Sequence, residues 1–289
     1  MQVWFTEDWT PHMRLSLKTG QVIHREESAY QEIVVLETDQ SGRVLILDDV
    51  IQTTEKDEFV YHEMLVHVPM TVHPNPRSVL IIGGGDGGTA REVLKHDPVE
   101  RAVMVEIDRR VVEVSREHLP SLSGSLSDPR LELVFVDGIE YVRENKDSFD
   151  VIIIDSTDPV GVATGLFSGS FYRRVKDCLN EKGLFSQQTA SPFYNRPLLR
   201  RLQRDLSEIF PVSTFYLGVV PTYPGGLWSY SLGSKRYDPV DFDASRARAL
   251  ECRYYSPEIH RASLALPPFC RALLPNPADA QPPVQEEEH

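Results

Sequence analysis

The spacing of hydrophobic and polar residues divides this chain at about residue 77. After that point, short runs of consecutive apolar residues alternate with helix-like segments. Continuous apolar strands that alternate with helices indicate a parallel sheet covered on both faces. The predicted strands are Val79–Ile82, Val103–Val105, Leu131–Val136, Asp150–Ile154, Gly183–Gln188 and Val212–Val219, with a last, antiparallel strand at Leu227–Gly233. The predicted helices are Thr89–His96, Arg109–His118, Ser170–Leu179 and Leu198–Phe210.

Before residue 77 the pattern is that of an antiparallel sheet. Tyr30–Thr38 and Arg43–Leu47 are both strand-like. The residues between them, Asp39-Gln40-Ser41-Gly42, form a turn sequence, so the pair is predicted to be a hairpin. Gln21–Arg25 is a candidate for a further strand.

A helix is expected over Glu55–Val72, with Thr54 as its N-cap. The expected apolar face of this helix includes Phe59, Leu65 and Val68. Pro74 and Pro76 then mark the boundary with the following segment.

The fold class that these patterns predict is α/β: a methyltransferase-like Rossmann domain with a parallel sheet and a final antiparallel strand, preceded by a small antiparallel β domain. The expected divisions are an N-terminal β domain (1–54), a connecting helix and linker (55–76), a Rossmann-like catalytic domain (77–236), a C-terminal appendage (237–274) and a disordered tail (275–289). The tail prediction rests on its proline-rich and acidic composition.

The composition narrows the class of ligand. The 289 residues carry a net charge of -13, which disfavours nucleic acid as a partner and favours cationic ligands. The 3 cysteines show neither metal-ligand spacing nor a disulfide framework. The start, MQVWFTEDWT, does not resemble a signal peptide, and no apolar run approaches the ~18 residues of a membrane helix. We therefore expect a cytoplasmic protein that does not bind membranes.

A glycine-rich loop follows the first strand of the Rossmann-like segment. The loop contains Asp86 and five glycines, which are Gly83, Gly84, Gly85, Gly87 and Gly88. Strand, glycine turn and helix in this order begin a nucleotide-binding α/β unit. Glu106, 23 residues beyond Gly83, is close to the ~20-residue spacing at which an acid binds a ribose.

Carboxylates follow each of the first four strands of this segment. Asp86 follows the first, Glu106 the second, Asp137-Gly138 the third, and Asp155 and Asp158 the fourth. Each has a structural alternative, because Asp155 or Asp158 could cap a helix and Asp137 could form a turn. Ligands of open α/β sheets bind at the carboxyl ends of the strands, so together these residues predict an anionic crevice.

The crevice suits a cationic nucleoside. Glu106 fits a ribose, and Asp137 with Gly138 fits an adenine amino group. Asp86 would repel the pyrophosphate of a dinucleotide, which disfavours a dehydrogenase. A sulfonium such as S-adenosylmethionine fits better, although Asp86 would repel its carboxylate. A decarboxylated sulfonium with a terminal aminopropyl group is therefore favoured.

These residues carry a resemblance to the spermidine synthases of the polyamine aminopropyltransferase family, of bacterial type, over roughly residues 3–270. The matching stretches are LDDVIQTTEKDEFVYHEM, VLIIGGGDGGTAREVLKH, VEID, DG, DSTDPVG, PTYPGGLW and RYYSPEIHRASLALPPF. The resemblance implies aminopropyl transfer from decarboxylated S-adenosylmethionine to putrescine, giving spermidine and 5′-methylthioadenosine. The donor is then a co-substrate, with no separate cofactor or metal. A homodimer or homotetramer is also implied.

The resemblance assigns roles by position. Asp155 resembles the catalytic base of the family. The residues that resemble donor contacts are Gln31, Asp86, Glu106, Asp137, Gly138 and Val162. The residues that resemble amine contacts are Tyr61, His62, Asp86, Asp155, Asp158, Gln188 and Tyr223. Without the family, His62 would pass as a core or surface histidine, Gln31 as an exposed strand residue and Tyr223 as a loop anchor.

The chain departs from the family pattern at two places. Asp49 stands where the family usually has glycine after Leu-Asp. Val162-Ala163-Thr164 stands where the family usually has proline, then alanine or glycine, then glutamate. Val162 would lie near the adenine, so the second departure bears on the edge of the donor pocket.

In the predicted mechanism, Asp155 takes a proton from the attacking nitrogen while more distant acids hold the far ammonium. Three alternatives remain open from the sequence. The acceptor could be spermidine, cadaverine or another amine. The protein could be a putrescine N-methyltransferase that uses ordinary S-adenosylmethionine, or a non-catalytic polyamine-binding or nucleoside-binding protein.

Overall fold

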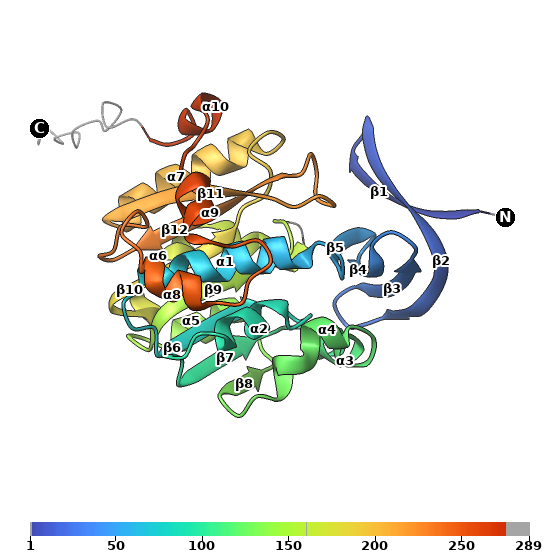
Figure 1. Cartoon of the computed structure of the whole chain (residues 1–289), viewed down its shortest axis with the longest axis horizontal. Helices are drawn as coiled ribbons and strands as arrows, with labels where there is room; N and C mark the ends of the chain where they lie inside the picture. The colour runs from blue at the N-terminus through green and yellow to red at the C-terminus, as the bar shows by residue number, and fades with distance from the viewer. Residues whose placement is uncertain (1, 160, 276–289) are drawn as a thin grey trace, which may run out of the picture.

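The chain folds into two β-sheets joined by a buried helix (Figure 1). The computed structural model describes residues 2–159 and 161–275. The N-terminal sheet is antiparallel, with the order β1-β2-β3-β4-β5. Its strands are β1 (Val3–Thr10), β2 (Met13–Glu27), β3 (Glu32–Thr38), β4 (Gly42–Leu47) and β5 (Val50–Thr54).

The predicted hairpin at Tyr30–Leu47 is confirmed as β3 and β4. The long β1–β2 hairpin was not predicted, apart from Gln21–Arg25 within β2. Apart from the buried Glu7 of β1, the residues of both strands are exposed or partly buried, so neither strand contains the continuous apolar run that marks a strand in the sequence. The turn between β4 and β5 explains one departure from the family pattern. Asp49 there has φ 64°, a left-handed conformation that aspartate tolerates in place of glycine.

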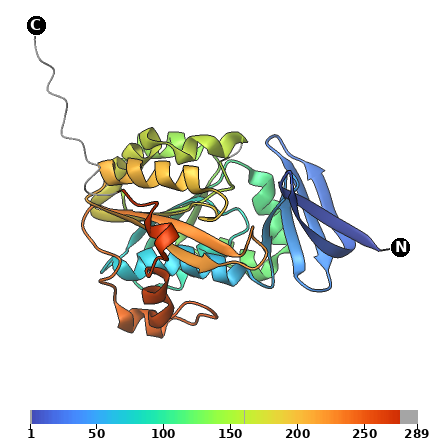
Figure 2. The ribbon, with the colours of Figure 1, turned by 90° about the horizontal axis from the view of Figure 1, so that it is seen from above.

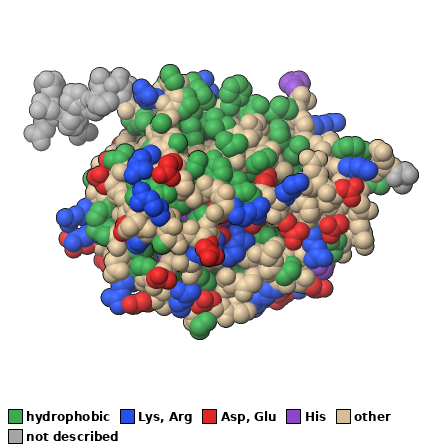
Figure 3. Space-filling view, in the orientation of Figure 1, with side chains coloured by type: hydrophobic (Ala, Val, Ile, Leu, Met, Phe, Trp, Pro, Cys, Tyr) green, Lys and Arg blue, Asp and Glu red, His purple; other side chains and the backbone are tan. Residues whose placement is uncertain are grey.

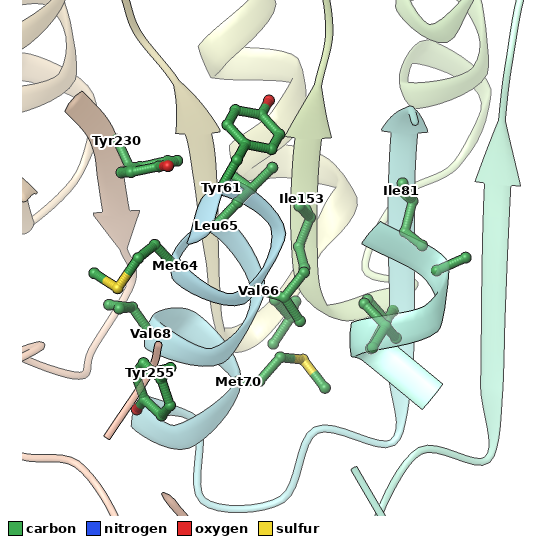
Figure 4. Packing of buried hydrophobic residues seen from close by; sticks show 14 of the residues in the cluster. Tyr61, Met64, Leu65, Val66, Val68, Met70, Ile81, Ile153, Tyr230 and Tyr255 are labelled. Atoms are coloured by element: carbon green, nitrogen blue, oxygen red, sulfur yellow. The ribbon is translucent and has the colours of Figure 1, made fainter. Parts of the chain in front are cut away.

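Helix α1 (Glu58–Val72) connects the two sheets, and it begins three residues later than predicted. Thr54 is not its N-cap. The Thr54 hydroxyl instead donates a hydrogen bond of 2.7 Å to Asp57, which occupies the N-cap position. The helix has no polar face either, because every residue of it except Phe59 is buried. Figure 4 shows its side chains among Ile81, Ile153, Tyr230 and Tyr255, which come from three strands and the C-terminal segment.

The second sheet confirms the predicted parallel sheet with an antiparallel strand. Its order is β11-β12-β10-β9-β6-β7-β8. Strand β12 is antiparallel to both of its neighbours, and the other pairs in this sheet are parallel. The strands are β6 (Ser78–Gly83), β7 (Arg101–Val105), β8 (Leu131–Val134), β9 (Phe149–Asp155), β10 (Leu179–Gln188), β11 (Val212–Val219) and β12 (Leu227–Ser234).

Helices cover both faces of this sheet (Figure 2). Val79 and Ile81 of β6 face α1 and α2, whereas Leu80 and Ile82 face α5, α6 and α7. This alternation is why the strand is apolar at four consecutive positions. The helical elements are α2 (Gly88–Leu94), α3 (Arg109–His118), α4 (Pro120–Ser123), η1 (Gly124–Ser127), α5 (Gly138–Glu144), η2 (Gly161–Phe167), α6 (Gly169–Cys178) and α7 (Arg196–Ile209).

The N-terminal sheet packs against α3. Ile33 and Leu45 from the sheet share a buried cluster with Val111 and Val114 from the helix. Because α3 follows β7 directly, this cluster fixes the N-terminal sheet at the carboxyl end of the second sheet. One end of the molecule therefore combines residues from both sheets.

The C-terminal segment, whose position could not be predicted, covers α1. It contains α8 (Ala244–Ala249), α9 (Pro257–Ser263) and α10 (Pro268–Arg271). Its anchor is Glu63 of α1, whose carboxylate accepts hydrogen bonds of 2.8 Å from three consecutive backbone N–H groups, those of Arg253, Tyr254 and Tyr255. The predicted disordered tail lies outside the described residues from 276 onward.

The surface mixes both signs of charge, with hydrophobic side chains gathered over α7 and the segments beside it (Figure 3). Phe193 and Tyr194, which precede α7, are 65% and 40% exposed. None of the helices within residues 2–159 and 161–275 has the length and hydrophobicity that crossing a membrane requires.

Candidate active site

The site lies where the chain changes direction within the second sheet. From β6 the chain continues to β7 and β8 on one side, and β9 returns to the other side of β6. Gly84 bridges this point by donating its N–H to the carbonyl of Asp155 over 2.9 Å. Gly83 has φ 84°, and a Cβ there would lie 2.1 Å from the same carbonyl oxygen. Only glycine fits at position 83, and such a switch point is where doubly wound sheets bind ligands.

A cavity opens at this point, between the two sheets. The structure brings ten of the predicted site residues to its wall, which are Gln31, Tyr61, Asp86, Glu106, Asp137, Gly138, Asp155, Asp158, Gln188 and Tyr223. The predicted anionic crevice is therefore present, and it draws on residues from both sheets and from α1.

One predicted site residue of the described part of the chain is not on this wall. His62 is 1% exposed and lies behind Asp86 rather than beside the cavity. The side chain of Val162 lies outside the described residues. A contact of His62 with the amine and a contact of Val162 with adenine remain predictions.

Asp155 is held by two hydroxyl groups. Tyr61 donates a hydrogen bond of 2.6 Å to Asp155 Oδ1, and Thr89 donates one of 2.7 Å to Oδ2. Burial raises the pKa of Asp155, although the nearby His62 charge and both hydroxyl donors oppose the rise. The result is a fixed carboxylate that is more basic than an exposed aspartate, as a general base requires.

Asp86 is fixed by the glycine loop and by His62. Its Oδ1 accepts the N–H of Gly88 over 2.7 Å and lies 3.5 Å from His62 Nε2. Burial opposes ionisation of Asp86, but the His62 charge outweighs it and lowers the pKa of this carboxyl. Asp86 therefore presents a negative charge inside the loop that in dinucleotide-binding proteins holds a phosphate.

Glu106 and Gln31 form another part of the cavity wall. Both contact Asp108, the N-cap of α3: Glu106 Oε1 accepts its N–H over 2.9 Å, and the Gln31 amide donates to its carboxylate over 3.0 Å. Burial raises the pKa of Glu106 to about 7. An ionised Glu106 in this position can accept two hydrogen bonds from a diol.

Asp137 and Gly138 begin α5 at the end of β8. Asp137 is the N-cap, since its side chain accepts the N–H of Ile139 over 2.7 Å. Asp137 therefore has a structural role at the start of the helix and also lines the cavity. A Cβ on Gly138 would lie 2.5 Å from Ile82, and Gly138 also lines the cavity.

The other end of the cavity gathers polar groups around Asp158. The Gln188 amide donates to Asp158 over 3.3 Å, and Tyr223 donates to the carbonyl of Gln52 over 2.5 Å. Burial raises the pKa of Asp158. This end therefore adds a further buried carboxylate to the cavity wall.

Glu7 and Thr89 were not among the predicted site residues. Glu7 lies in β1, lines the cavity, and is 7% exposed. Burial raises its pKa to about 7, and the Asp158 charge adds to the rise. The sequence contained a pattern that could have identified Glu7. Phe5, Glu7 and Trp9 alternate along β1, so Glu7 points to the same inward side as two aromatic residues. Thr89 carries no such local signal.

The fold and this site together indicate a class of enzyme. A methyltransferase-like Rossmann sheet with a cavity at its switch point, and with carboxylates in place of phosphate-binding groups, is typical of a transferase that binds a cationic nucleoside. Comparisons with known proteins agree with this class. The spermine/spermidine synthase domain matches residues 58–244, and the spermidine synthase tetramerisation domain matches residues 3–55.

Relatives of known name match nearly the whole chain. A polyamine aminopropyltransferase of Moorella thermoacetica is 52% identical over 96% of this chain and 99% of its own length. One of Bacillus cytotoxicus is 45% identical over 95% of this chain and 100% of its own length.

Solved structures agree as well. A spermidine synthase in complex with the transition-state analogue AdoDATO has a TM-score of 0.92 at 48% identity, over 94% of each chain. The spermidine synthase from Thermotoga maritima has a TM-score of 0.90, also at 48% identity over 94% of each chain. The chain belongs to the polyamine aminopropyltransferase family, the spermine/spermidine synthases, and it is a transferase.

Proposed function

We propose that this protein is a spermidine synthase, which transfers the aminopropyl group of decarboxylated S-adenosylmethionine to putrescine. The observation that carries the proposal is the pair Asp86 and Asp155, two carboxylates that line one cavity at the switch point of the sheet. Asp86 suits a bare ammonium and repels a carboxylate, so it favours the decarboxylated donor over S-adenosylmethionine. Asp155 is then left to receive a proton.

The donor is proposed to lie along the glycine loop. Its ribose would meet Glu106, its adenine would meet Asp137 and Gly138, and its aminopropyl nitrogen would meet Asp86. Gln31 and Val162 complete the proposed donor contacts. The acceptor would lie between Asp155 and Asp158, with Tyr61, Gln188 and Tyr223 around it. Glu7 would add a second acid for the far ammonium.

The reaction is an in-line displacement. The acceptor nitrogen forms a bond to the aminopropyl carbon next to sulfur as the carbon–sulfur bond breaks. The bonding pair passes to sulfur, so the sulfonium leaves as neutral 5′-methylthioadenosine. The nitrogen gives its proton to Asp155, whose two hydroxyl partners, Tyr61 and Thr89, hold it in place. Positioning the two substrates can supply ~7–11 kcal/mol of the barrier reduction.

The proposal includes an oligomer and a place in the cell. A homodimer or homotetramer formed through residues 3–55 is supported by the match of that segment to a tetramerisation domain. Light scattering of the purified chain would measure its mass, and a monomer at micromolar concentration would contradict this part. A cytoplasmic location fits the family, and fractionation of cells tests it.

The first experiment measures 5′-methylthioadenosine release from purified protein with putrescine. Decarboxylated and ordinary S-adenosylmethionine are tested in parallel. Release with the decarboxylated donor alone supports the proposal. Turnover of the ordinary donor to S-adenosylhomocysteine would make the protein a methyltransferase, and stronger turnover with spermidine or cadaverine would change the acceptor. Binding of both substrates without turnover would contradict the proposal.

A further inference from the structure

A second layer of paired charges lies beneath the cavity wall. Glu58 stands one turn before His62 on α1, and its Oε2 is 2.6 Å from His62 Nδ1. The other ring nitrogen, Nε2, is 3.5 Å from Asp86 Oδ1. The imidazole ring of His62 therefore lies between two carboxylates, and only Asp86 of the two faces the cavity.

Arg91 of α2 completes this layer. Its Nη2 donates a hydrogen bond of 2.8 Å to the same Glu58 oxygen that contacts His62. The same guanidinium also donates from Nε to Glu92 over 2.8 Å, and Glu92 pairs with Lys95 over 2.7 Å. If His62 is protonated, these three carboxylates are matched by three cationic groups. A buried cluster of charges is stable only when it is matched in this way.

The ring of His62 packs closely against the start of α2. A Cβ on Gly88, the first residue of α2, would lie 2.3 Å from the ring. The ring is thus packed directly on the backbone of α2 while Gly88 donates its N–H to Asp86 Oδ1. Because Oδ1 is used by Gly88 and His62, Oδ2 is the oxygen of Asp86 that remains for a ligand.

His62 also affects Asp155, which it does not contact. Asp86 and Asp155 line the same cavity, and two like charges so placed favour a shared proton. The His62 charge opposes this for both carboxylates. The titratable and charged groups that face His62 are Glu58 and Tyr61 of α1, Asp86 of the glycine loop, Arg91 of α2 and Asp155 of β9.

We propose that Glu58 is a positioning residue for aminopropyl transfer: it holds the His62 ring in its charged form against Asp86, and so keeps Asp86 and Asp155 free of protons during turnover. This rests on the proposed function, because it assigns those two carboxylates to the donor amine and to the attacking nitrogen. Burial opposes the charged ring, but Asp86 and Glu58 outweigh it and raise the pKa of His62 well above its usual value.

The variant Glu58→Gln tests the proposal through its pH dependence. Rates of the variant and of wild type are measured from pH 6 to 9 at fixed substrate concentrations, and their ratio is plotted. The titration of the amine substrate is common to both proteins and cancels in the ratio. We expect near wild-type rates at pH 9 and a ratio that falls about tenfold per pH unit below a midpoint near neutral pH.

The matched control is Glu63→Gln on the same helix. Glu63 is 1% exposed, and its carboxylate holds the C-terminal segment rather than His62. This variant is expected to lower thermal stability but to give a ratio that does not vary with pH. A pH-independent ratio for Glu58→Gln would overturn the proposal, because it would show only a structural role.

A nuclear magnetic resonance experiment keeps the proposal testable if the variant does not fold. In wild-type protein labelled with ¹⁵N in histidine, we expect the ring of His62 to remain doubly protonated at pH 8. His96 and His260 are internal references, because burial lowers the pKa of both. A neutral His62 ring at pH 8 would overturn the proposal. Absence of transfer by wild type in the first experiment would instead contradict the proposed function, and the resonance test would still stand.

Discussion

At the scale of single side chains, burial and four neighbouring groups set the pKa of Asp155. Burial and the Asp86 charge favour its protonated form, whereas the His62 charge and the hydroxyls of Tyr61 and Thr89 favour the ionised form. The balance raises the pKa of Asp155 above that of an exposed aspartate, which makes its carboxylate a better proton acceptor. Its two hydrogen bonds also fix both oxygens, so that little reorganisation is needed as the nitrogen attacks.

Asp155→Asn should therefore lower single-turnover release of 5′-methylthioadenosine by about 10²–10⁴-fold, the usual contribution of a general base. The amide keeps the shape of the side chain, so we expect the dissociation constant of 5′-methylthioadenosine, measured by calorimetry, to change by less than about threefold. Loss of that binding would mean that Asp155 is a binding residue and not the base.

Glu7→Gln should weaken binding of the diamine and leave donor binding unchanged. A hydrogen bond to a charged group contributes about 1.5–3 kcal/mol, so we expect KM for putrescine to rise about tenfold or more. The inhibition constant of 1-butylamine, which lacks the far ammonium, should be the same in variant and wild type.

The control for this prediction is Asp8→Asn, the next residue of β1, whose exposed side chain pairs with Arg14. It should leave both constants unchanged. Equal weakening of putrescine and 1-butylamine by Glu7→Gln would show that Glu7 does not contact the far ammonium.

Helix α1 serves three parts of the molecule through three consecutive residues. Tyr61 contacts Asp155, His62 contacts Asp86, and Glu63 holds the C-terminal segment. Successive residues of an α-helix point about 100° apart, so consecutive side chains reach different neighbours. A helix with partners on every side has no polar face, which is why the predicted amphipathic pattern was wrong.

Helix α2 supplies a test of this packing. Gly88→Ala places a methyl group 2.3 Å from the His62 ring, so the ring or the start of the helix must shift. Overpacking of this kind typically costs about 1–3 kcal/mol. We expect a loss of that size in the free energy of urea unfolding, together with weaker donor binding because Asp86 shifts with the ring.

Gly124→Ala is the matched control for Gly88→Ala. Gly124 has φ -56°, and a Cβ at this position would have nothing within 4 Å apart from its chain neighbours. Replacing a glycine in such a conformation should stabilise the protein by about 0.4–1 kcal/mol, through the unfolded chain. Similar destabilisation by both substitutions would contradict the role given to the His62 ring.

At the scale of the whole molecule, the burial of Glu106 in the cavity lowers the free energy of unfolding as the pH rises. Burial raises the pKa of Glu106 from 4.5 to about 7. The folded state therefore binds this proton more tightly than the unfolded state between those two values. The stabilisation from the bound proton is complete below pH 4.5 and is lost as the pH rises through 7.

Glu106→Gln should consequently increase the free energy of unfolding at pH 8 by up to about 3 kcal/mol relative to wild type. The thermal midpoint should rise accordingly. The difference should shrink toward pH 5, where the wild-type carboxyl is already protonated. Scanning calorimetry from pH 5 to 8 measures it. A difference that is constant across this range would contradict the assigned burial effect. The variant should also bind 5′-methylthioadenosine more weakly.

Glu132→Gln on β8 is the control for this series. The Glu132 side chain is 56% exposed and pairs with Arg101. Removing one exposed ion pair usually changes stability by less than about 1 kcal/mol, and we expect no trend with pH.

Local signals decided much of the fold. The predicted bounds of α3 and β11 match those observed, because α3 has its Asp108 cap and β11 is a compact β-branched and aromatic strand. The hairpin of β3 and β4 followed from its turn residues. The short helices α8, α9 and α10 could not be placed, because their positions depend on Glu63 and other distant contacts.

The sequence by itself determined which carboxylates meet, because strand ends of a parallel sheet share one edge and the acids follow the strands directly. Only the tertiary structure decided what holds them. Glu7 shares a cavity wall with Asp158, far from it in the chain, because the N-terminal sheet packs on α3. His62 lies behind Asp86, not in the cavity, because its ring packs on Gly88, where α2 begins, with no room for a side chain between them. Such contacts depend on how whole elements pack, and no local pattern of residues encodes that.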